Sequence, residues 1–222
     1  ASASTESIKS KLVGQINYQM KFGEYKFVVI ASDFNNPAII DSTEFNLLVE
    51  NYSSGVKMSD IELATSINKS TDTKSIFYKN TLEVTPNAGG LYGKNVSELY
   101  YYLELYNLSS ANVSDEITFK KRVLNLNNEE QFSSFKKIKR GPESRVETGM
   151  IKIDTMKSGS YILELSLIDS AKNTYIVKNK KFFLFTFSDD TQSSNKGQQD
   201  YLKSEFVTLT ESDLDDLFDK II

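Results

Sequence analysis

The chain of 222 residues contains no cysteine, no histidine and no tryptophan. The absence of cysteine excludes disulfide bonds, thiolate metal sites and a cysteine nucleophile. The absence of histidine removes the commonest general base and the commonest zinc ligand, and it excludes a Ser-His-Asp triad within the chain. Carboxylates are the acid–base groups that remain, and no spacing singles out a pair of them for glycoside hydrolysis. We therefore expect a protein that is not an enzyme and has no cofactor and no metal site.

Two further features are missing from the sequence. No apolar run is long enough to span a membrane, and residues 1–10 are small and polar, unlike a signal peptide. If the protein is exported, its signal lies outside this chain. The net charge of −4 and the pI near 5.1 give no global attraction to nucleic acid or to an anionic membrane. We therefore expect neither a nucleic-acid partner nor a membrane span.

Short segments that alternate apolar and polar residues dominate the chain, and Gly, Asn, Asp and Ser separate them. Many such segments without intervening helices favour a sandwich over a parallel α/β sheet. The pattern predicts a mainly β protein built from immunoglobulin-like antiparallel β-sandwich modules. The predicted strands are 12–20, 25–31, 45–49, 61–67, 76–84, 99–108, 117–126, 135–138, 146–153, 161–168 and 174–187.

An internal repeat refines this prediction. In segments 23–33 and 159–169, a Gly, a Tyr and an Asp stand at identical spacing around an alternating strand. A tyrosine near the start of such a strand anchors the preceding corner in immunoglobulin-like sandwiches. Residues 11–50 should therefore form strands equivalent to those of residues 146–187. Only about one strand fits before the first copy, so we expect a partial module there, with a small extra sheet on the main sandwich as the alternative.

The predicted organisation has three parts. Residues 1–57 form a partial or small immunoglobulin-like module, residues 58–187 a full sandwich, and residues 188–222 a polar linker and a C-terminal amphipathic helix. Thr210 is suited to cap this helix. Its apolar stripe should dock on the sandwich, another subunit or a further domain, and consists of Leu214, Leu217, Phe218 and Ile221.

Two sets of alternating residues share the predicted strand 99–108. One set forms a core face and consists of Leu99, Tyr101, Leu103 and Leu105. The other set is rich in tyrosine and consists of Tyr100, Tyr102, Glu104 and Tyr106. Tyrosine offers an apolar ring with a polar tip, so the second face could bind a sugar or a peptide. The alternative is that a neighbouring domain covers this face.

Several segments resemble the bacterial envelope proteins that are named for a GWxTD motif and are found mainly in Bacteroidetes. The similar segments are MSDIELA at 58–64, FYKNTLEVTPN at 77–87, LYYYLELYNL at 99–108 and LTESDLDDL at 209–217. The resemblance covers roughly residues 20–222. Because the chain has no Trp, the motif itself is absent, and the similarity is to the β-rich region upstream of it. The resemblance implies a periplasmic or extracellular location, but no activity.

Two hypotheses about function follow. The first is a non-enzymatic structural or protein-interaction module of the bacterial cell envelope, with a protein partner or self-association. The second is a carbohydrate-binding module that holds a glycan on the tyrosine-rich face. The sequence identifies neither the ligand nor the oligomeric state.

Overall fold

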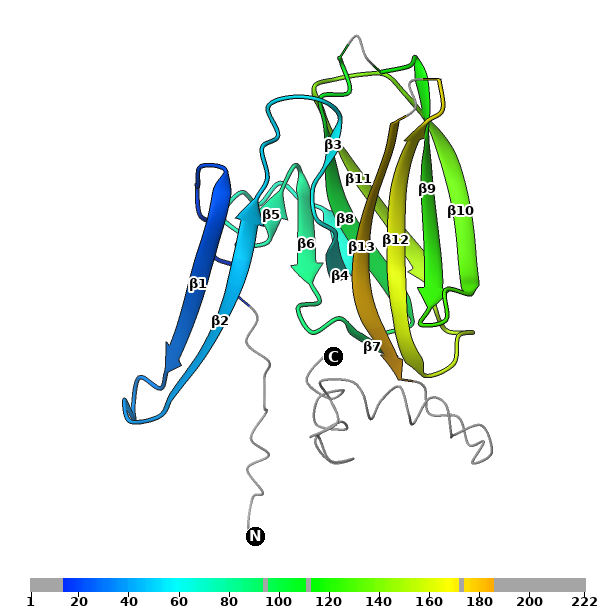
Figure 1. The fold of residues 1–222 in the computed structure, drawn as a ribbon. Helices are drawn as coiled ribbons and strands as arrows, with labels where there is room; N and C mark the ends of the chain where they lie inside the picture. Colours follow the sequence, from blue (N-terminus) through cyan, green and yellow to red (C-terminus); the bar gives the residue numbers. More distant parts are fainter. Residues whose placement is uncertain (1–13, 94–95, 111–112, 172–173, 186–222) are drawn as a thin grey trace. The chain divides into compact units, whose positions relative to one another are not determined.

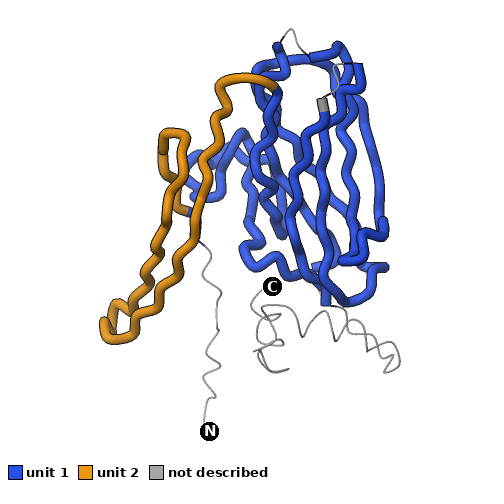
Figure 2. Tube along the Cα trace, viewed as in Figure 1, with its two compact units in different colours: residues 1–15, 56–222 blue, residues 16–55 orange. Residues whose placement is uncertain are grey.

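The computed structural model describes residues 14–93, 96–110, 113–171 and 174–185, which form strands and no α-helix (Figure 1). These residues belong to two compact units. Ile16–Gly55 forms the smaller unit, and the other described residues belong to the larger one (Figure 2). The predicted linker and C-terminal helix at 188–222 lie outside the described residues. The described part contains no helix that is long and apolar enough to cross a membrane.

The smaller unit, Ile16–Gly55, is a single antiparallel hairpin. Strand β1 (Gly23–Ser32) pairs with β2 (Ile40–Val49) along its whole length. The strand predicted at 12–20 is wrong over its described part, since residues 14–20 form no strand. Alternation alone does not make a strand, because the backbone also needs a neighbouring strand for its hydrogen bonds.

The larger unit is an antiparallel, immunoglobulin-like β-sandwich, which confirms the predicted fold class. Its first sheet runs in the order β10 (Glu130–Lys139), β9 (Glu116–Asn125), β12 (Gly159–Asp169), β13 (Thr174–Phe185) and β7 (Leu91–Gly93). Its second sheet runs in the order β11 (Ser144–Lys152), β8 (Glu98–Tyr106), β4 (Glu62–Lys69), β6 (Leu82–Pro86) and β5 (Tyr78–Lys79). Strand β3 (Lys57–Met58) also pairs with β8. All described pairs in this unit are antiparallel except β7 with β13.

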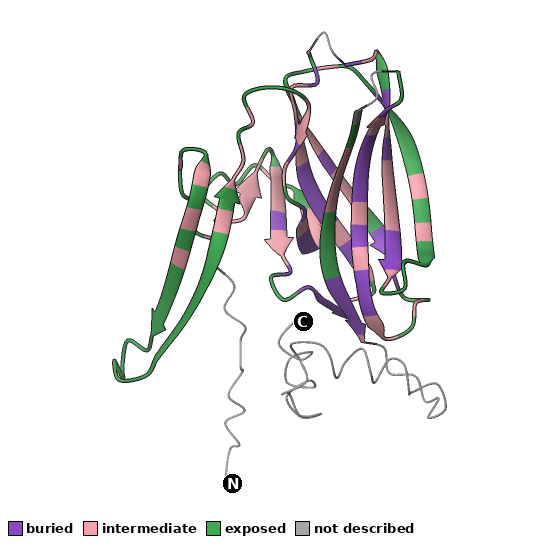
Figure 3. Cartoon of the chain, viewed as in Figure 1, coloured by how far each residue is buried: buried purple, intermediate pink, exposed green. Residues whose placement is uncertain are grey.

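The core lies between the two sheets, where alternate residues of facing strands are buried (Figure 3). The predicted core face of β8 is confirmed, because each of its four side chains is at most 2% exposed: Leu99, Tyr101, Leu103 and Leu105. They form one cluster with the inward residues of β12 and β13, among them Leu163, Leu165 and Phe182. Burial of each large apolar side chain contributes roughly 1.5–3 kcal/mol.

The two Gly-x-Tyr segments have the same local structure. The Tyr25 hydroxyl donates to the carbonyl oxygen of Lys21 at 3.0 Å, and the Tyr161 hydroxyl donates to that of Lys157 at 2.7 Å. Each tyrosine lies near the start of the first strand of an antiparallel hairpin, β1–β2 or β12–β13. The repeat in the sequence therefore corresponds to a repeated corner and hairpin.

The strand predicted at 76–84 is wrong as a single element. Asn80 and Thr81 have φ angles of 49° and 64°, and this left-handed pair forms a tight turn between β5 and β6. Two successive positive φ angles are typical of a two-residue hairpin turn, and asparagine tolerates them better than most residues. The turn therefore divides the segment that alternation predicted as one strand into two short strands, β5 and β6.

Candidate functional site

The candidate site is the outer face of β8, opposite the core. Tyr102 is 5% exposed there, and the side chains of Tyr100, Glu104 and Tyr106 are half-buried. Three of the four predicted residues meet at the Glu104 carboxylate. The fourth, Tyr100, donates its hydroxyl hydrogen bond to Glu98 Oε2 at 2.6 Å instead. This bond and burial raise the pKa of the Tyr100 hydroxyl.

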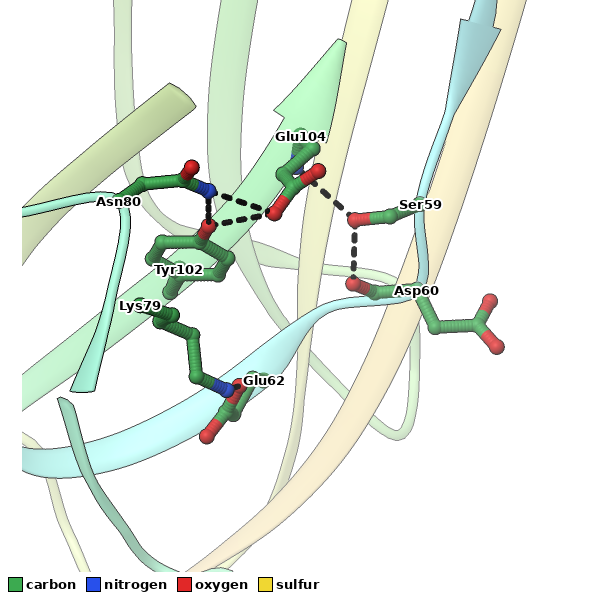
Figure 4. Close-up of polar contacts among 7 residues, drawn as sticks. All are labelled: Ser59, Asp60, Glu62, Lys79, Asn80, Tyr102 and Glu104. Atoms are coloured by element: carbon green, nitrogen blue, oxygen red, sulfur yellow. Dashed lines mark hydrogen bonds and ion pairs between the residues drawn. The ribbon is translucent and has the colours of Figure 1, made fainter. Parts of the chain in front are cut away.

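The Glu104 carboxylate accepts hydrogen bonds from three side chains, two of them drawn in Figure 4. Its Oε1 accepts from the Tyr102 hydroxyl at 2.5 Å and from Asn80 Nδ2 at 2.9 Å. Its Oε2 accepts from the Tyr106 hydroxyl. Asn80 Nδ2 also donates to the Tyr102 hydroxyl oxygen at 2.5 Å. The hydroxyl of Tyr102 is thus both donor and acceptor in one closed network.

Asn80 is the residue of this network that sequence reasoning did not assign to the site. The Lys79-Asn80 pair is visible in the sequence as a turn signal. Nothing local shows that the amide reaches Tyr102, which is 22 residues further along the chain. The left-handed turn between β5 and β6 brings the amide to the face of β8.

Lys79 lies beside the ring of Tyr102 and pairs with Glu62. Its Nζ is 2.5 Å from Glu62 Oε2 and 5.3 Å from the centroid of the Tyr102 ring (Figure 4). Glu62 is the residue directly opposite Tyr102 in the β4–β8 register. An ammonium over an aromatic ring is attracted to its π face. Lys79 therefore occupies ring surface that a stacked ligand would need.

Burial raises the pKa of the Tyr102 hydroxyl, and its hydrogen bond to Glu104 raises that pKa further. The ring belongs to a small outer cluster with Ala64 and Val84, all at most 5% exposed. Partly buried neighbours complete the cluster: Ile67, Leu82, Tyr100 and Val146. The chain's own β4, β6 and β11 supply this cover, so Tyr102 is a packed residue and not an open platform. A ligand-binding role for this face stays a prediction.

Ser59 fixes the backbone of β8 next to this carboxylate. The backbone N–H of Glu104 donates to Ser59 Oγ at 2.9 Å, and Ser59 Oγ donates to the carbonyl oxygen of Asp60 at 2.9 Å (Figure 4). The backbone N–H of Ser59 in turn donates to the carbonyl oxygen of Glu104 at 2.9 Å. Glu104 is thus held by hydrogen bonds to both its carboxylate and its backbone. This arrangement suits a fixed structural acceptor better than a mobile acid or base.

Other carboxylates on or next to the strands are also bonded within the chain. Glu164 Oε1 accepts from Arg122 at 2.6 and 2.9 Å, and this bond raises the pKa of the guanidinium. Asp33 Oδ1 accepts from the backbone N–H groups of Asn35 and Asn36, as in a capped turn. In the part of the chain that the structure describes, no group of three or more carboxylates is arranged to hold a metal ion.

Asp169 differs from its repeat counterpart Asp33. It is 5% exposed, and its carboxylate accepts from the backbone N–H of Ser114 at 2.8 Å and from Ser114 Oγ at 2.6 Å. This bond connects the end of β12 to the segment before β9. The repeat is local and does not extend to long-range contacts.

Replacement of Glu104 by alanine should lower the free energy of unfolding by about 2 kcal/mol, because it removes the shared acceptor of Tyr102, Tyr106 and Asn80. Urea denaturation measures the loss. Glu98→Ala is the matched control, since it removes one hydrogen bond, to Tyr100, from the same strand; its expected cost is under about 1 kcal/mol. Equal losses in both variants would contradict a central role for Glu104.

No family model matches the chain, and no curated protein matches its sequence. Among solved structures, the dimeric latent PorU of Porphyromonas gingivalis matches 76% of this chain and 13% of its own, with 7% identity and a TM-score of 0.37. The β-glucuronidase of Parabacteroides merdae matches 65% of this chain and 15% of its own, with 12% identity and a TM-score of 0.30. The chain thus spans a small fraction of either protein, and similarities of this size say nothing about function.

Proposed function

We propose that the chain is a non-enzymatic structural or protein-interaction module of the bacterial cell envelope. The observation that supports an interaction role most directly is the β1–β2 hairpin. Large apolar side chains along both its strands are substantially exposed: Val28 56%, Val29 44%, Ile30 67%, Ile40 62%, Phe45 48% and Leu48 61%. The strand register places four of these side chains on one face of the hairpin, namely Val28, Ile30, Ile40 and Leu48, and it places Val29 and Phe45 on the other. Exposed apolar surface marks interaction sites in folded proteins.

The hairpin has a physical reason to bind another protein. An isolated two-stranded hairpin is marginally stable in water, and a third strand or a covering layer is what stabilises it. Covering each large apolar side chain would contribute roughly 1.5–3 kcal/mol. A binding partner would therefore gain affinity from the same surface that the hairpin needs to bury.

The non-enzymatic part of the proposal is supported by residue chemistry. The sequence has no His and no Cys, and the carboxylates Glu104, Glu164 and Asp169 are hydrogen-bonded within the chain. The envelope location is supported by the resemblance of segments 58–64, 77–87 and 99–108 to proteins with a GWxTD motif. The carbohydrate alternative has less support, because Lys79 lies over the ring of Tyr102 and burial leaves little of that ring to a sugar.

Site-specific photo-cross-linking tests the proposal. A photoreactive phenylalanine analogue replaces Val29 in a chain that carries an export signal and is produced in a Bacteroidetes host. We expect a discrete protein adduct in the envelope fraction. The control position is Phe135, which is 69% exposed on β10 of the other unit.

Three results would count against this function. The first is the absence of a discrete adduct at Val29, and the second is an adduct of equal yield and mass at Phe135. The third is reproducible binding on a glycan array that Tyr102→Ala abolishes, which would favour the carbohydrate alternative.

A further inference from the structure

Lys121 is a lysine on the core-facing side of β9. Side chains alternate along a strand, and the inward neighbours of Lys121, Phe119 and Val123, are at most 1% exposed. Lys121 lies opposite Ser134 of β10 and opposite Leu165 of β12 in the two strand registers. Lys121 itself is half-buried, and β10 is the edge strand of its sheet. Its amine is thus attached to a core face next to an edge of the sandwich.

The ammonium group of Lys121 lies near two aromatic rings, one from each sheet. Its Nζ is 5.6 Å from the ring centroid of Phe132 on β10 and 5.8 Å from that of Tyr101 on β8. The rings attract a cation, but they do not replace the hydrogen bonds to water that a buried ammonium loses. Burial at this position therefore favours the neutral amine over the ammonium.

The one buried carboxylate in this region is already bound by two other cations. Glu147 of β11 binds Lys136 Nζ through one oxygen, at 2.5 Å, and Arg145 Nε through the other, at 2.6 Å. Lys121 has no ion pair in the part of the chain that the structure describes. Lys136 is instead its diagonal neighbour across the β9–β10 register, since Ser134 lies opposite Lys121.

Burial and the nearby charge of Lys136 both lower the pKa of the Lys121 amine. A lysine becomes a nucleophile when it is desolvated or lies next to another cation, and Lys121 meets both conditions. Its neighbour Lys120 meets neither, because it points to the outer face of β9 and pairs with Glu130 at 4.0 Å. The fold therefore makes two adjacent lysines chemically different.

We propose that Lys121 is a nucleophilic amine that small aldehydes modify in preference to the ion-paired lysines around it. The lone pair of the neutral Nζ attacks the carbonyl carbon, and one proton passes from the nitrogen to the carbonyl oxygen to give a carbinolamine. That hydroxyl leaves with the second proton of the nitrogen as water, so one amine and one aldehyde give one imine and one water. The aldehyde is small, because the rings of Phe132 and Tyr101 lie beside the amine. This inference is independent of the proposed interaction function.

The test is limited labelling of the whole chain with propionaldehyde and sodium cyanoborohydride, which reduces the imine to a stable propylamine. Mass spectrometry of proteolytic peptides measures the rate at each lysine, and Lys120 is the matched reference on the same strand. At pH 8 we expect Lys121 to react at least about threefold faster than Lys120, and its rate should level off at a lower pH. In the chain unfolded by urea, the two rates should agree within about twofold, because both amines are then in water.

A pair of variants tests the role of the neighbouring charge. Lys136→Gln should slow the labelling of Lys121 at least about twofold, because it removes a positive charge and leaves one oxygen of Glu147 without its cation. Lys137→Gln is the control, since Lys137 is the next residue on β10 and pairs with Glu116 on the outer face; it should leave the rate at Lys121 unchanged.

Three results would overturn the inference. The first is labelling of Lys121 in the folded chain that is no faster than that of Lys120. The second is a preference for Lys121 that persists in urea, which would assign the reactivity to the local sequence. The third is an equal effect of the two variants on Lys121. The first two measurements use the unaltered chain, so they decide the question even if Lys136→Gln fails to fold.

Discussion

Replacement of Gly93 by alanine is expected to lower the free energy of unfolding by about 4 kcal/mol, from roughly 1–3 kcal/mol of backbone strain and as much again from overpacking. A Cβ at this position would lie 1.7 Å from the carbonyl oxygen of Phe185, where no contact is tolerated. The φ angle of Gly93 is 127°, which side chains rarely adopt. Gly93 pairs with Phe185 where β7 joins β13, so relief would require this parallel pair to separate.

Two other glycines make the test quantitative. A Cβ at Gly149 would lie 2.4 Å from the hydroxyl of the buried Tyr101, but the φ angle of Gly149 is not positive, so Gly149→Ala adds no backbone strain of this kind and should cost less, about 2 kcal/mol. A Cβ at Gly89 meets nothing within 4 Å, and Gly89→Ala should change stability by at most about 0.5 kcal/mol. Chemical denaturation measures all three. A loss at Gly93 no larger than that at Gly89 would show that β7 is not held against β13.

Stability is expected to fall steeply above pH 10, because the core holds buried tyrosines. Tyr92 is 0% exposed and Tyr101 is 2% exposed. Burial raises the pKa of both hydroxyls, and the nearby charge of Glu147 raises that of Tyr101 further. The unfolded chain loses these protons near pH 10, whereas the folded chain keeps them. The stabilisation is thus fully present below about pH 10 and is lost as the pH rises toward the raised folded pKa values.

The expected slope is about 1.4 kcal/mol per pH unit for each tyrosine with a strongly raised pKa, or about 4 kcal/mol for Tyr92, Tyr101 and Tyr102 together. Urea denaturation at pH 9, 10, 11 and 11.5 measures the slope, and absorbance at 295 nm follows tyrosinate formation. Tyr92→Phe should remove about a third of the slope, at the cost of the hydrogen bond to the carbonyl oxygen of Ala64. Complete tyrosine ionisation in the folded state by pH 10.5 would refute this explanation.

A buried carboxylate shows how far tertiary contacts exceed what a sequence pattern predicts. Glu147 of β11 is 2% exposed and binds Lys136 Nζ at 2.5 Å and Arg145 Nε at 2.6 Å. Lys136 belongs to β10, at the edge of the other sheet, so this ion pair joins the two sheets. In the sequence, the basic run around Lys136 predicts only a solvated strand or loop. The sequence does not show that Glu147 is the partner, because ion pairs between two sheets follow no repeating pattern along the chain.

The sequence alone determined the β-sandwich class, the core face of β8 and the repeated Gly-x-Tyr corner. These features are local: alternation assigns each side chain to one face of a strand, and the tyrosine hydroxyl bonds a carbonyl only four residues away. The turn at Asn80 was predictable only in part. The sequence contains a turn signal there, but it does not show that the turn brings the Asn80 amide to the face of β8.

Only the tertiary structure decided which outer-face residues are available. It carried Asn80 to Glu104, which is 24 residues away, and it covered the ring of Tyr102 while leaving Val29 exposed. Tyr102 and Val29 both carry large, mainly apolar side chains in segments that alternate apolar and polar residues. The surrounding sequence does not show which of the two is covered. What separates them is whether another strand or side chain packs over the face, and that depends on contacts between segments distant in the chain, which no local pattern encodes.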